Sequence, residues 1–369
     1  MKILVTGASG FVGKNLIAEL NNRGYMDIYK FDIDTDKSLL NEYAKNCKFV
    51  FHLAGVNRPK DEKEFMEGNF GFTSQLLNLL IEHNNKAPIL ITSSIQAERD
   101  NPYGNSKRAG EELLFDYSKK TGSKALVYRL HNLFGKWSRP NYNTVVATYC
   151  YNIARDLDIQ VSNSDAELSL CYIDDVLDEF IRALEGNPTK ANEYCSVPVN
   201  HQIKLGDLAD RIKGFKDSRN NLSISNMEDE LTKKLYSTYL SFLPEDSFSY
   251  DLKMNKDNRG SFTEFIRTPD RGQVSVNVAK PGITKGNHWH NTKNEKFLVV
   301  SGTGVIRFRK IDTDEIIEYK VSGEKLQVVD IPTGYTHSIV NIGDVDMVTV
   351  MWVNEAFNPE KSDTYFLEV

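Results

Sequence analysis

The fold of the first half of the chain is decided by the stretch Val5-Thr6-Gly7-Ala8-Ser9-Gly10-Phe11-Val12-Gly13. Its glycines are three residues apart, between an apolar run at residues 2–5 and a helical pattern at residues 13–23. Glycine permits a tight turn and lets the backbone approach a pyrophosphate, and the N–H groups that start the following helix attract anions. The stretch therefore predicts a strand, a phosphate-binding loop and a helix. An ordinary strand–helix turn is the alternative.

Short strand-like runs alternate with helical patterns over the rest of residues 1–200. The strand-like runs are at residues 28–31, 49–53, 89–93 and 125–130, and the helical patterns are at residues 72–82 and 108–119. This alternation predicts an α/β fold with a Rossmann-like, doubly wound, mainly parallel sheet. Asp32 follows the second strand, where an acidic residue can accept hydrogen bonds from an adenosine ribose. A polar loop that contains Asp32, Asp34 and Asp36 is the alternative.

The character of the sequence changes near residue 249. Short strand-like runs then follow one another between glycines and prolines, at residues 274–279, 296–300, 305–309, 315–321, 326–331, 337–341 and 347–353. Such spacing predicts an all-β sandwich or barrel. Residues 203–243 have mostly helical patterns, so we place the boundary at residues 244–250. We expect one domain at residues 1–243 and a second at residues 250–369.

Composition and charge exclude several classes of protein. The 369 residues carry a formal net charge of −6, which argues against a chain built to coat nucleic acid. No apolar run reaches the roughly 18 residues of a membrane span, and the N-terminus lacks a signal-peptide pattern. The four cysteines are scattered and form no CxxC motif: Cys47, Cys150, Cys171 and Cys195. We therefore expect a reduced, cytoplasmic protein with no nucleic-acid or membrane partner.

A serine, a tyrosine and a lysine form the first candidate catalytic group. Ser93 and Ser94 end a strand-like run, and Tyr103 and Lys107 lie four residues apart, on one face of a helical pattern. A free tyrosine has a pKa of about 10, and a neighbouring ammonium lowers that pKa by stabilising the phenolate. A serine hydroxyl near both groups can hold a substrate carbonyl. A solvated helix face is the alternative interpretation of the tyrosine–lysine pair.

These features together resemble the extended short-chain dehydrogenase/reductase family of nucleotide-sugar enzymes. The resemblance covers about 240 residues and is carried by Thr6-Gly-Ala-Ser-Gly-Phe-Val-Gly13, His52-Leu-Ala-Gly55, Asn69, Ser93-Ser94, Tyr103-x-x-x-Lys107, Arg129-Leu-His-Asn132 and Tyr172-Ile-Asp-Asp175. It implies that Tyr103 protonates a carbonyl oxygen while hydride arrives from a nicotinamide. It also implies that Lys107 binds the nicotinamide ribose and that Ser94, or else Ser93, orients the substrate.

The same resemblance implies two sets of binding residues. The substrate would contact Ser94, Arg129 and Asn132. The cofactor would contact Gly7, Ser9, Gly10, Phe11, Val12, Gly13, Asp32, Leu53, Ala54, Gly55, Asn69, Tyr103 and Lys107. Family members often carry a basic residue shortly before the place of Tyr172, where this chain has Glu167-Leu-Ser-Leu170. The sequence therefore does not identify the residues that bind the nucleotide diphosphate.

Three of the chain's seven histidines lie in two short blocks of the β-rich half. The first block contains His288, His290 and Glu295, and the second contains His337. His288 and His290 are two residues apart, so on a strand both side chains point to the same face. Together the four residues can form a cage of three nitrogens and one oxygen that suits zinc, iron, manganese or nickel. Histidines in surface loops are the alternative.

The two blocks resemble the two cupin motifs, and this resemblance covers residues 250–369. Leu326 occupies the place of the second motif's leading glycine, so a degenerate cupin without metal is an alternative. We expect one divalent ion per chain, zinc in a closed structural site.

The stretches Asp257-Asn-Arg-Gly-Ser-Phe-Thr-Glu-Phe265 and Lys285-Gly-Asn-His288 resemble the deoxysugar-nucleotide epimerase cupins, which remove a proton beside a 4-keto carbon. The general base of that group falls at His288, which the metal hypothesis makes a ligand. The base therefore stays open, and a metal-polarised ketone with another base is an alternative.

The pairing of these two domains resembles bifunctional enzymes of bacterial capsular polysaccharide synthesis. It implies a homodimer that acts on a UDP-linked 4-keto-6-deoxy-HexNAc. The cupin domain would epimerise C3 and the reductase domain would reduce C4. The product would be a UDP-2-acetamido-2,6-dideoxy-talose, the precursor of UDP-N-acetyl-L-fucosamine. Asp32 favours NADH, whereas the resemblance implies NADPH. We expect NADPH, with Lys14 and Arg23 as sources of positive charge. A cupin dioxygenase fused to a dehydrogenase and a non-catalytic nucleotide-sensing protein are the alternatives.

Overall fold

The computed structural model describes all 369 residues, and the chain divides into two compact units. The α/β unit consists of residues 1–213 and 228–244, and the β unit consists of residues 214–227 and 245–369. Residues 214–227 thus differ from the expectation of an uninterrupted first domain at residues 1–243. The backbone N–H of Arg267 donates to the carbonyl of Leu222 at 2.8 Å, a long-range contact that no local sequence pattern reveals.

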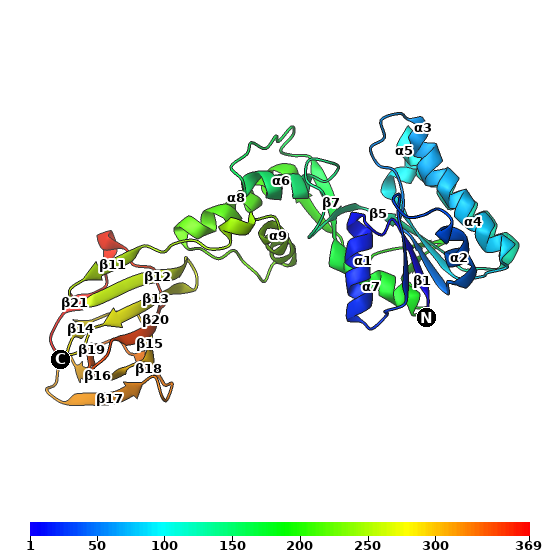
Figure 1. The fold of residues 1–369 in the computed structure, drawn as a ribbon. Coiled ribbons are helices and arrows are strands. Elements are labelled where there is room, and N and C mark those ends of the chain that lie inside the picture. Colours follow the sequence, from blue (N-terminus) through cyan, green and yellow to red (C-terminus); the bar gives the residue numbers. More distant parts are fainter. The chain divides into compact units, whose positions relative to one another are not determined.

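The α/β unit is built on a seven-stranded sheet with the order β2-β1-β3-β4-β5-β9-β8 (Figure 1). The strands are β1 (Ile3–Thr6), β2 (Ile28–Phe31), β3 (Phe49–His52), β4 (Ile89–Ser94), β5 (Ala125–Leu130), β8 (Lys190–Ala191) and β9 (Tyr194–Cys195). Neighbouring strands pair in parallel except for β8 and β9. The chain order reverses at β1, and sheets of this type bind ligands beyond the carboxyl ends of the strands at such a point. The prediction of a Rossmann-like parallel sheet is confirmed.

Helices cover both faces of this sheet (Figure 1). On one face lie α1 (Phe11–Asn22) and α7 (Ile173–Leu184), and on the other lie α2 (Leu39–Asn46), α4 (Phe72–Glu82) and α5 (Pro102–Thr121). Strand β1 shows why two cores form, since Ile3 and Val5 pack with α1 and α7 whereas Leu4 packs in the opposite core. Successive side chains of a strand point to opposite faces. No helix is both long and apolar enough to cross a membrane.

A smaller sheet with the order β10-β7-β6 accompanies the main sheet. The remaining elements of this part of the chain are α3 (Lys63–Phe65), a π-helical segment (Met66–Gly71), a 3₁₀ helix (Ile95–Glu98), β6 (Asn132–Phe134), α6 (Val145–Ile153), β7 (Glu167–Tyr172), β10 (His201–Lys204), α8 (Leu205–Asn221) and α9 (Glu230–Leu240). Strand β7 pairs in parallel with β6 and antiparallel with β10. The sequence analysis did not predict β6, β7 or β10.

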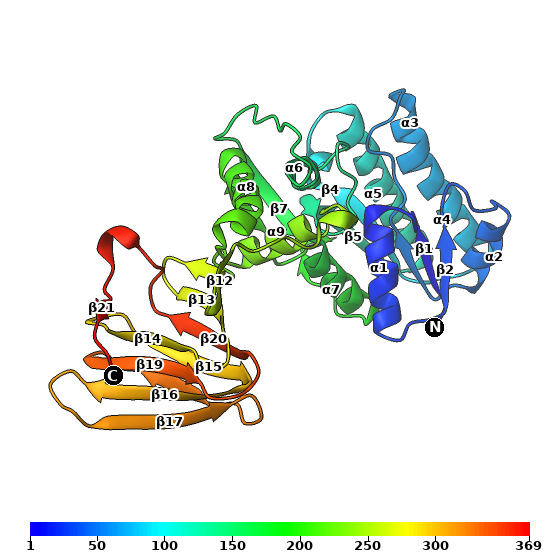
Figure 2. The same cartoon turned by 60° about the vertical axis from the view of Figure 1, so that its left-hand side comes forward.

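The β unit contains two antiparallel sheets, with the orders β11-β12-β13-β20-β15-β18 and β17-β16-β19-β14-β21 (Figure 2). The strands are β11 (Met254–Asp257), β12 (Gly260–Thr268), β13 (Gly272–Ala279), β14 (Thr284–Trp289), β15 (Glu295–Ser301), β16 (Thr303–Lys310), β17 (Ile316–Ser322), β18 (Val328–Ile331), β19 (Tyr335–Asn341), β20 (Met347–Val353) and β21 (Tyr365–Phe366). Phe297 and Val299 of the first sheet share one core with Ile306, Phe308 and Ile339 of the second. The prediction of an all-β domain is confirmed.

Candidate active site and metal centre

The glycine loop between β1 and α1 depends on close backbone contacts. Gly7 has a φ of 67°, and a Cβ at this position would lie 2.7 Å from the backbone nitrogen of Ala54. A Cβ on Gly13 would lie 2.2 Å from the carbonyl oxygen of Gly7. Any larger residue at either position would displace the backbone. Helix α1 begins at Phe11, where its free N–H groups and its dipole favour an anion.

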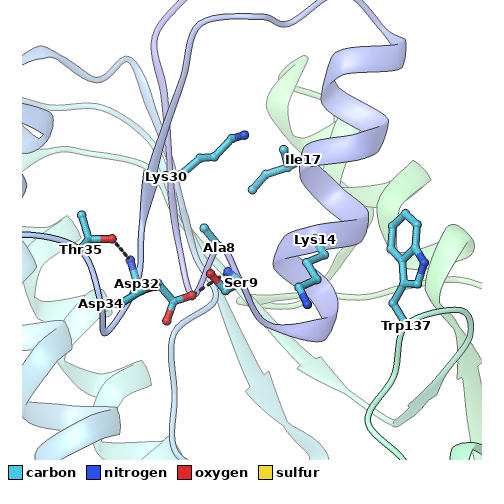
Figure 3. Close-up of a pocket in the computed structure, with 9 residues that line it drawn as sticks. All are labelled: Ala8, Ser9, Lys14, Ile17, Lys30, Asp32, Asp34, Thr35 and Trp137. Carbon is cyan, nitrogen blue, oxygen red and sulfur yellow. Dashed lines mark hydrogen bonds between the residues drawn. The ribbon is translucent and has the colours of Figure 1, made fainter.

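A wide pocket of about 820 Å³ opens beside the glycine loop (Figure 3). It is lined by Ala8, Ser9, Lys14, Ile17, Lys30, Asp32, Asp34, Thr35 and Trp137. Both carboxylate oxygens of Asp32 accept backbone hydrogen bonds, from the N–H of Ser9 at 2.7 Å and from the N–H of Ile33 at 2.8 Å. Asp32 therefore fastens the glycine loop to the end of β2.

The positive charge of this pocket comes from Lys14 on α1 and Lys30 on β2. Neither lysine forms an ion pair with a carboxylate. Arg23, which we expected to supply charge here, is not among the lining residues. Its guanidinium is held by Glu19 at 2.6 Å and by Asp178 at 2.7 Å. Lys30, and not Arg23 as we expected, therefore supplies positive charge to the pocket together with Lys14.

Helix α5 carries Tyr103 and Lys107 in its first two turns. Asn101 caps the helix, because its side-chain oxygen accepts the N–H of Gly104 at 2.8 Å. The Nζ of Lys107 lies 5.9 Å from the centre of the Tyr103 ring and donates to the carbonyl of Thr92 at 3.1 Å. The cap and this contact fix both side chains beside the end of β4.

Burial controls the protonation of both groups. It lowers the pKa of Lys107 to about 8, although the charge of Glu111 acts in the opposite direction. Burial also raises the pKa of Tyr103, and a hydrogen bond with Ser94 offsets only part of this rise. The expected lowering of the Tyr103 pKa by Lys107 is therefore wrong for this structure, because desolvation outweighs the neighbouring charge. At neutral pH the Tyr103 hydroxyl keeps its proton and can donate it.

The two serines that end β4 have different partners. Ser93 is buried, and its hydroxyl donates to the carboxylate of Glu111. The Ser94 hydroxyl accepts the N–H of Gln96 at 3.2 Å and is hydrogen-bonded to Tyr103. Ser94 is therefore the serine that lies at the tyrosine, which supports its choice over Ser93.

Glu111 is a buried acidic residue that the sequence analysis missed. It lies one turn after Lys107 on the same face of α5, and this spacing is the signal that would have revealed it. Arg129 of β5 binds its carboxylate at 2.6 Å and binds Glu98 at 3.0 Å. A substrate contact of Arg129 would have to break these bonds. Asn132, the other predicted substrate residue, is exposed at the first position of β6.

The chain after β3 runs close to α5. The Asn69 side chain donates to the Ser106 hydroxyl at 3.0 Å and to the carbonyl of Val56 at 3.1 Å. A Cβ on Gly55 would lie 3.0 Å from the Nζ of Lys107. The structure thus brings the predicted cofactor residues Gly55 and Asn69 close to Lys107.

A buried histidine joins the first and third strands to α4. The His52 ring lies between two threonine hydroxyls, with Nδ1 2.8 Å from that of Thr6 and Nε2 2.9 Å from that of Thr73. Burial lowers the pKa of His52 to about 3, so the ring is neutral. Leu53 and Ala54 follow, and their N–H groups bond to the carbonyl and the hydroxyl of Thr6 at 3.2 and 3.3 Å. These contacts hold the predicted cofactor residues Leu53 and Ala54 against the glycine loop.

His288 of β14, Glu295 of β15 and His337 of β19 lie close together, and His290 joins them from the residue after β14 ends. One ligand atom from each of the four residues lies within 4.8 Å of all the others. A bulge makes this possible, because Asn287 has a φ of 61° and the register between β14 and β19 shifts there. His288 then lies opposite His337 in the sheet.

The donor set of this cluster fits a divalent metal ion. Oε2 of Glu295 lies 3.1 Å from Nε2 of His337 and 3.7 Å from Nε2 of His290. These three buried atoms have no hydrogen-bond partner outside the cluster, and such unsatisfied buried atoms are uncommon. Burial lowers the pKa of His288 to about 4, so its imidazole is neutral at physiological pH and can act as a ligand. Three imidazole nitrogens and one carboxylate oxygen suit zinc and similar divalent transition metals.

Comparison with known families covers both halves of the chain. Residues 3–195 match the NAD dependent epimerase/dehydratase family. The chain belongs to this family. Membership in the epimerase/dehydratase family confirms an enzyme of the short-chain dehydrogenase/reductase type that depends on NAD or NADP. Residues 255–365 match the polysaccharide biosynthesis C-terminal domain.

Two relatives within the epimerase/dehydratase family cover the whole chain. The crystal structure of the capsular polysaccharide assembling protein CapF from Staphylococcus aureus is 56% identical, with a TM-score of 0.95 and 100% of both chains covered. A curated UDP-2-acetamido-2,6-beta-L-arabino-hexul-4-ose reductase from Pseudomonas aeruginosa is 47% identical over 100% of this chain and 99% of its own. UDP-glucuronic acid 4-epimerase from Bacillus cereus, solved with NAD, shares the fold alone, at 19% identity and a TM-score of 0.55 over 66% of this chain and 98% of its own.

Proposed function

We propose that this chain is a bifunctional nucleotide-sugar enzyme of capsular polysaccharide synthesis. The β unit epimerises C3 of a UDP-4-keto-6-deoxy-HexNAc, and the α/β unit reduces its C4 ketone with NADPH. The product is a UDP-2-acetamido-2,6-dideoxy-talose, the precursor of UDP-N-acetyl-L-fucosamine. The enzyme acts as a homodimer, as the resemblance implies. Support comes from the full-length relative whose name describes a reductase of a UDP-linked hexul-4-ose, at 47% identity.

The observation that carries the reduction step is the placement of Ser94, Tyr103 and Lys107 next to one another, with Lys107 beside Gly55. Tyr103 retains its proton at neutral pH and donates it to the carbonyl oxygen of the substrate. Ser94 holds the same oxygen by a hydrogen bond. Lys107 stabilises the phenolate that remains on Tyr103. NADPH, when bound, supplies the hydride to C4, and hydride and proton together convert the ketone into a secondary alcohol.

The pocket beside α1 supports NADPH as the reductant. In this proposal it receives the adenosine ribose. Both oxygens of Asp32 are already engaged by backbone N–H groups, which reduces the repulsion between this carboxylate and a 2′-phosphate. Lys14 and Lys30 line the same pocket without carboxylate partners, and two ammonium groups attract a phosphate dianion.

We assign the β unit to the cupin fold and its cluster of three histidines and Glu295 to one zinc ion. The support is the convergence of four ligand atoms, among them buried atoms of His290, Glu295 and His337 that have no hydrogen-bond partner outside the cluster. In a closed site of four protein ligands the ion is structural and stabilises the β unit. The proton that leaves C3 is acidic because the neighbouring 4-ketone stabilises the enolate. His288 is assigned as a ligand, so the base is another residue.

Solvent exchange tests the division of labour between the units. In D₂O without NADPH, the full chain should exchange the C3 hydrogen of UDP-4-keto-6-deoxy-HexNAc for deuterium. His290→Ala should abolish this exchange and should leave NADPH binding unchanged, because the α/β unit holds the cofactor residues. C4 reduction by the wild-type chain with no C3 exchange would contradict the epimerase assignment.

A further inference from the structure

Two arginines of the α/β unit converge on one tyrosine. The Cζ atom of Arg58 lies 5.8 Å from the centre of the Tyr142 ring, and the Cζ atom of Arg139 lies 4.8 Å from the same centre. Both guanidinium groups are exposed, and neither forms an ion pair with a carboxylate. By contrast, Arg23 and Arg129 are each held by two acidic side chains. Two cations without acidic partners that contact the same ring can both be directed at one anion.

The loop that carries Arg58 is tied to the catalytic residues at both ends. At its start, a Cβ on Gly55 would lie 3.0 Å from the Nζ of Lys107. At its end, the ring of Phe65 lies 5.6 Å from the ring of Tyr103. Arg58 therefore lies on a short connection that begins beside the catalytic lysine and ends on the catalytic tyrosine.

The loop that carries Arg139 and Tyr142 follows β6 and leads into α6. Its backbone is constrained, because Trp137 and Asn141 have φ values of 66° and 54°. The N–H of Asn141 donates to the hydroxyl of Thr148 at 3.0 Å, which anchors the loop to α6. Non-glycine residues with positive φ cost energy and often occur where a loop is shaped for a ligand.

A diphosphate is the ligand that this arrangement fits. The planar guanidinium forms paired hydrogen bonds with phosphate oxygens, and an aromatic ring beneath it fixes its orientation. The diphosphate of the cofactor already has a site at the glycine loop and the start of α1. The nucleotide-sugar substrate carries a second diphosphate, for which Glu167-Leu-Ser-Leu170 supplies no basic residue.

We propose that Arg58 and Arg139, held on Tyr142, bind the diphosphate of the nucleotide-sugar substrate. This inference rests on the proposed function, because it takes the substrate to be a nucleotide sugar. The chain has a formal net charge of −6 and so repels an anionic substrate overall. The two guanidinium groups supply local positive charge for the diphosphate. The segment that carries Arg58 begins at Gly55, next to Lys107, and ends at Phe65, next to Tyr103, so a diphosphate bound there places the attached sugar beside the catalytic pair.

Binding of UDP and of NADPH to the full chain, measured separately by calorimetry, tests the proposal. Arg58→Gln and Arg139→Gln should each weaken UDP binding by roughly tenfold or more, and should raise the KM for the UDP-sugar while kcat stays unchanged. NADPH affinity should not change. Arg58→Lys and Arg139→Lys should lose part of the UDP affinity, since lysine keeps the charge but not the paired hydrogen bonds. Arg271→Gln, which removes an exposed arginine of the β unit, is the matched control.

Weaker NADPH binding with unchanged UDP binding would overturn the proposal, because the pair would then hold the diphosphate of the cofactor. Unchanged binding of both ligands in the double variant would overturn it as well. UDP binding is measured without turnover. A failure of the proposed enzymatic function can therefore be distinguished from a failure of the diphosphate site. A chain that loses UDP affinity in these variants but never reduces a 4-keto sugar would refute the reductase assignment and leave the diphosphate site standing.

Discussion

The carbonyl oxygen of Asp363 lies 2.5 Å from Nδ1 of His290. A carbonyl only accepts, so Nδ1 carries the proton and Nε2 is left to face the other candidate ligands. The carboxylate of the same Asp363 accepts the backbone N–H groups of Asn291, Thr292 and Lys293 at 3.0, 2.7 and 3.0 Å. One residue near the C-terminus thus fixes both the tautomer of a candidate metal ligand and the loop that follows it.

Asp363→Ala should weaken the metal site. The loop at residues 291–293 loses its acceptor, and the segment that holds His290 loses its anchor. Changes to groups that orient a metal ligand typically lower metal affinity by roughly 10–100-fold. Competition with a chromogenic chelator measures this loss directly. Asp344→Ala, in an exposed loop of the same unit, should retain the metal as the wild type does. Equal affinities in the two variants would contradict this role.

Tyr103→Phe should abolish the reduction while leaving the fold intact. The variant keeps the buried ring and its contact with Phe65 but loses the hydroxyl that donates the proton. General acid–base groups contribute roughly 10²–10⁴-fold to rates, so kcat should fall by that factor. Steady-state oxidation of NADPH with the UDP-4-keto sugar measures it. An unchanged circular dichroism spectrum and unchanged NADPH binding are the controls, and near wild-type reduction would refute the assignment.

The reductase should lose activity as the pH rises through about 8. Burial lowers the pKa of Lys107 to about 8, so its ammonium is charged below that pH and neutral above it. The pKa of Tyr103 is raised by burial, so the phenol does not titrate in this window. The pH profile of kcat/KM reports groups of the free enzyme and should show this descending limb. In Lys107→Met the limb should be absent, and its persistence would assign it to another group.

Lys14→Gln and Lys30→Gln should each reduce the preference for NADPH over NADH. Both lysines line the pocket beside Asp32, and the two cofactors differ only in the 2′-phosphate. We expect the KM for NADPH to rise by roughly tenfold and the KM for NADH to stay the same. Lys86→Gln, far along the chain and outside this pocket, is the control. A wild-type chain that prefers NADH would defeat the choice of cofactor.

The sequence predicted the bounds of those helices and strands whose apolar residues recur at a regular spacing. Helix Phe72–Glu82 and strands Ala125–Leu130 and Met347–Val353 have the predicted bounds, because their apolar spacing is regular. Strand Thr284–Trp289 was missed, since Gly286 and Asn287 disfavour a strand and only pairing with β19 stabilises it.

In the candidate sites, too, features within short segments were predictable, whereas contacts between distant elements were not. The glycine loop and the cluster of His288, His290, Glu295 and His337 were predicted from spacing, because each motif lies within a short segment or pairs two recognisable ones. The ion pair of Arg129 with Glu111 was not, since it joins residues on different elements. The hydrogen bond of Ser93 to Glu111, which distinguishes this serine from Ser94, also depends on the tertiary fold.

The fate of the cofactor hydride tests the central claim most directly. The full chain is incubated with UDP-4-keto-6-deoxy-HexNAc and NADPH that carries deuterium at the transferred position of the nicotinamide, and the sugar is analysed by NMR. The account predicts one deuterium at C4 of a UDP-2-acetamido-2,6-dideoxy-talose for each NADPH oxidised. An unreduced C4 ketone, or oxidation of NADPH with no deuterium on the sugar, would contradict it.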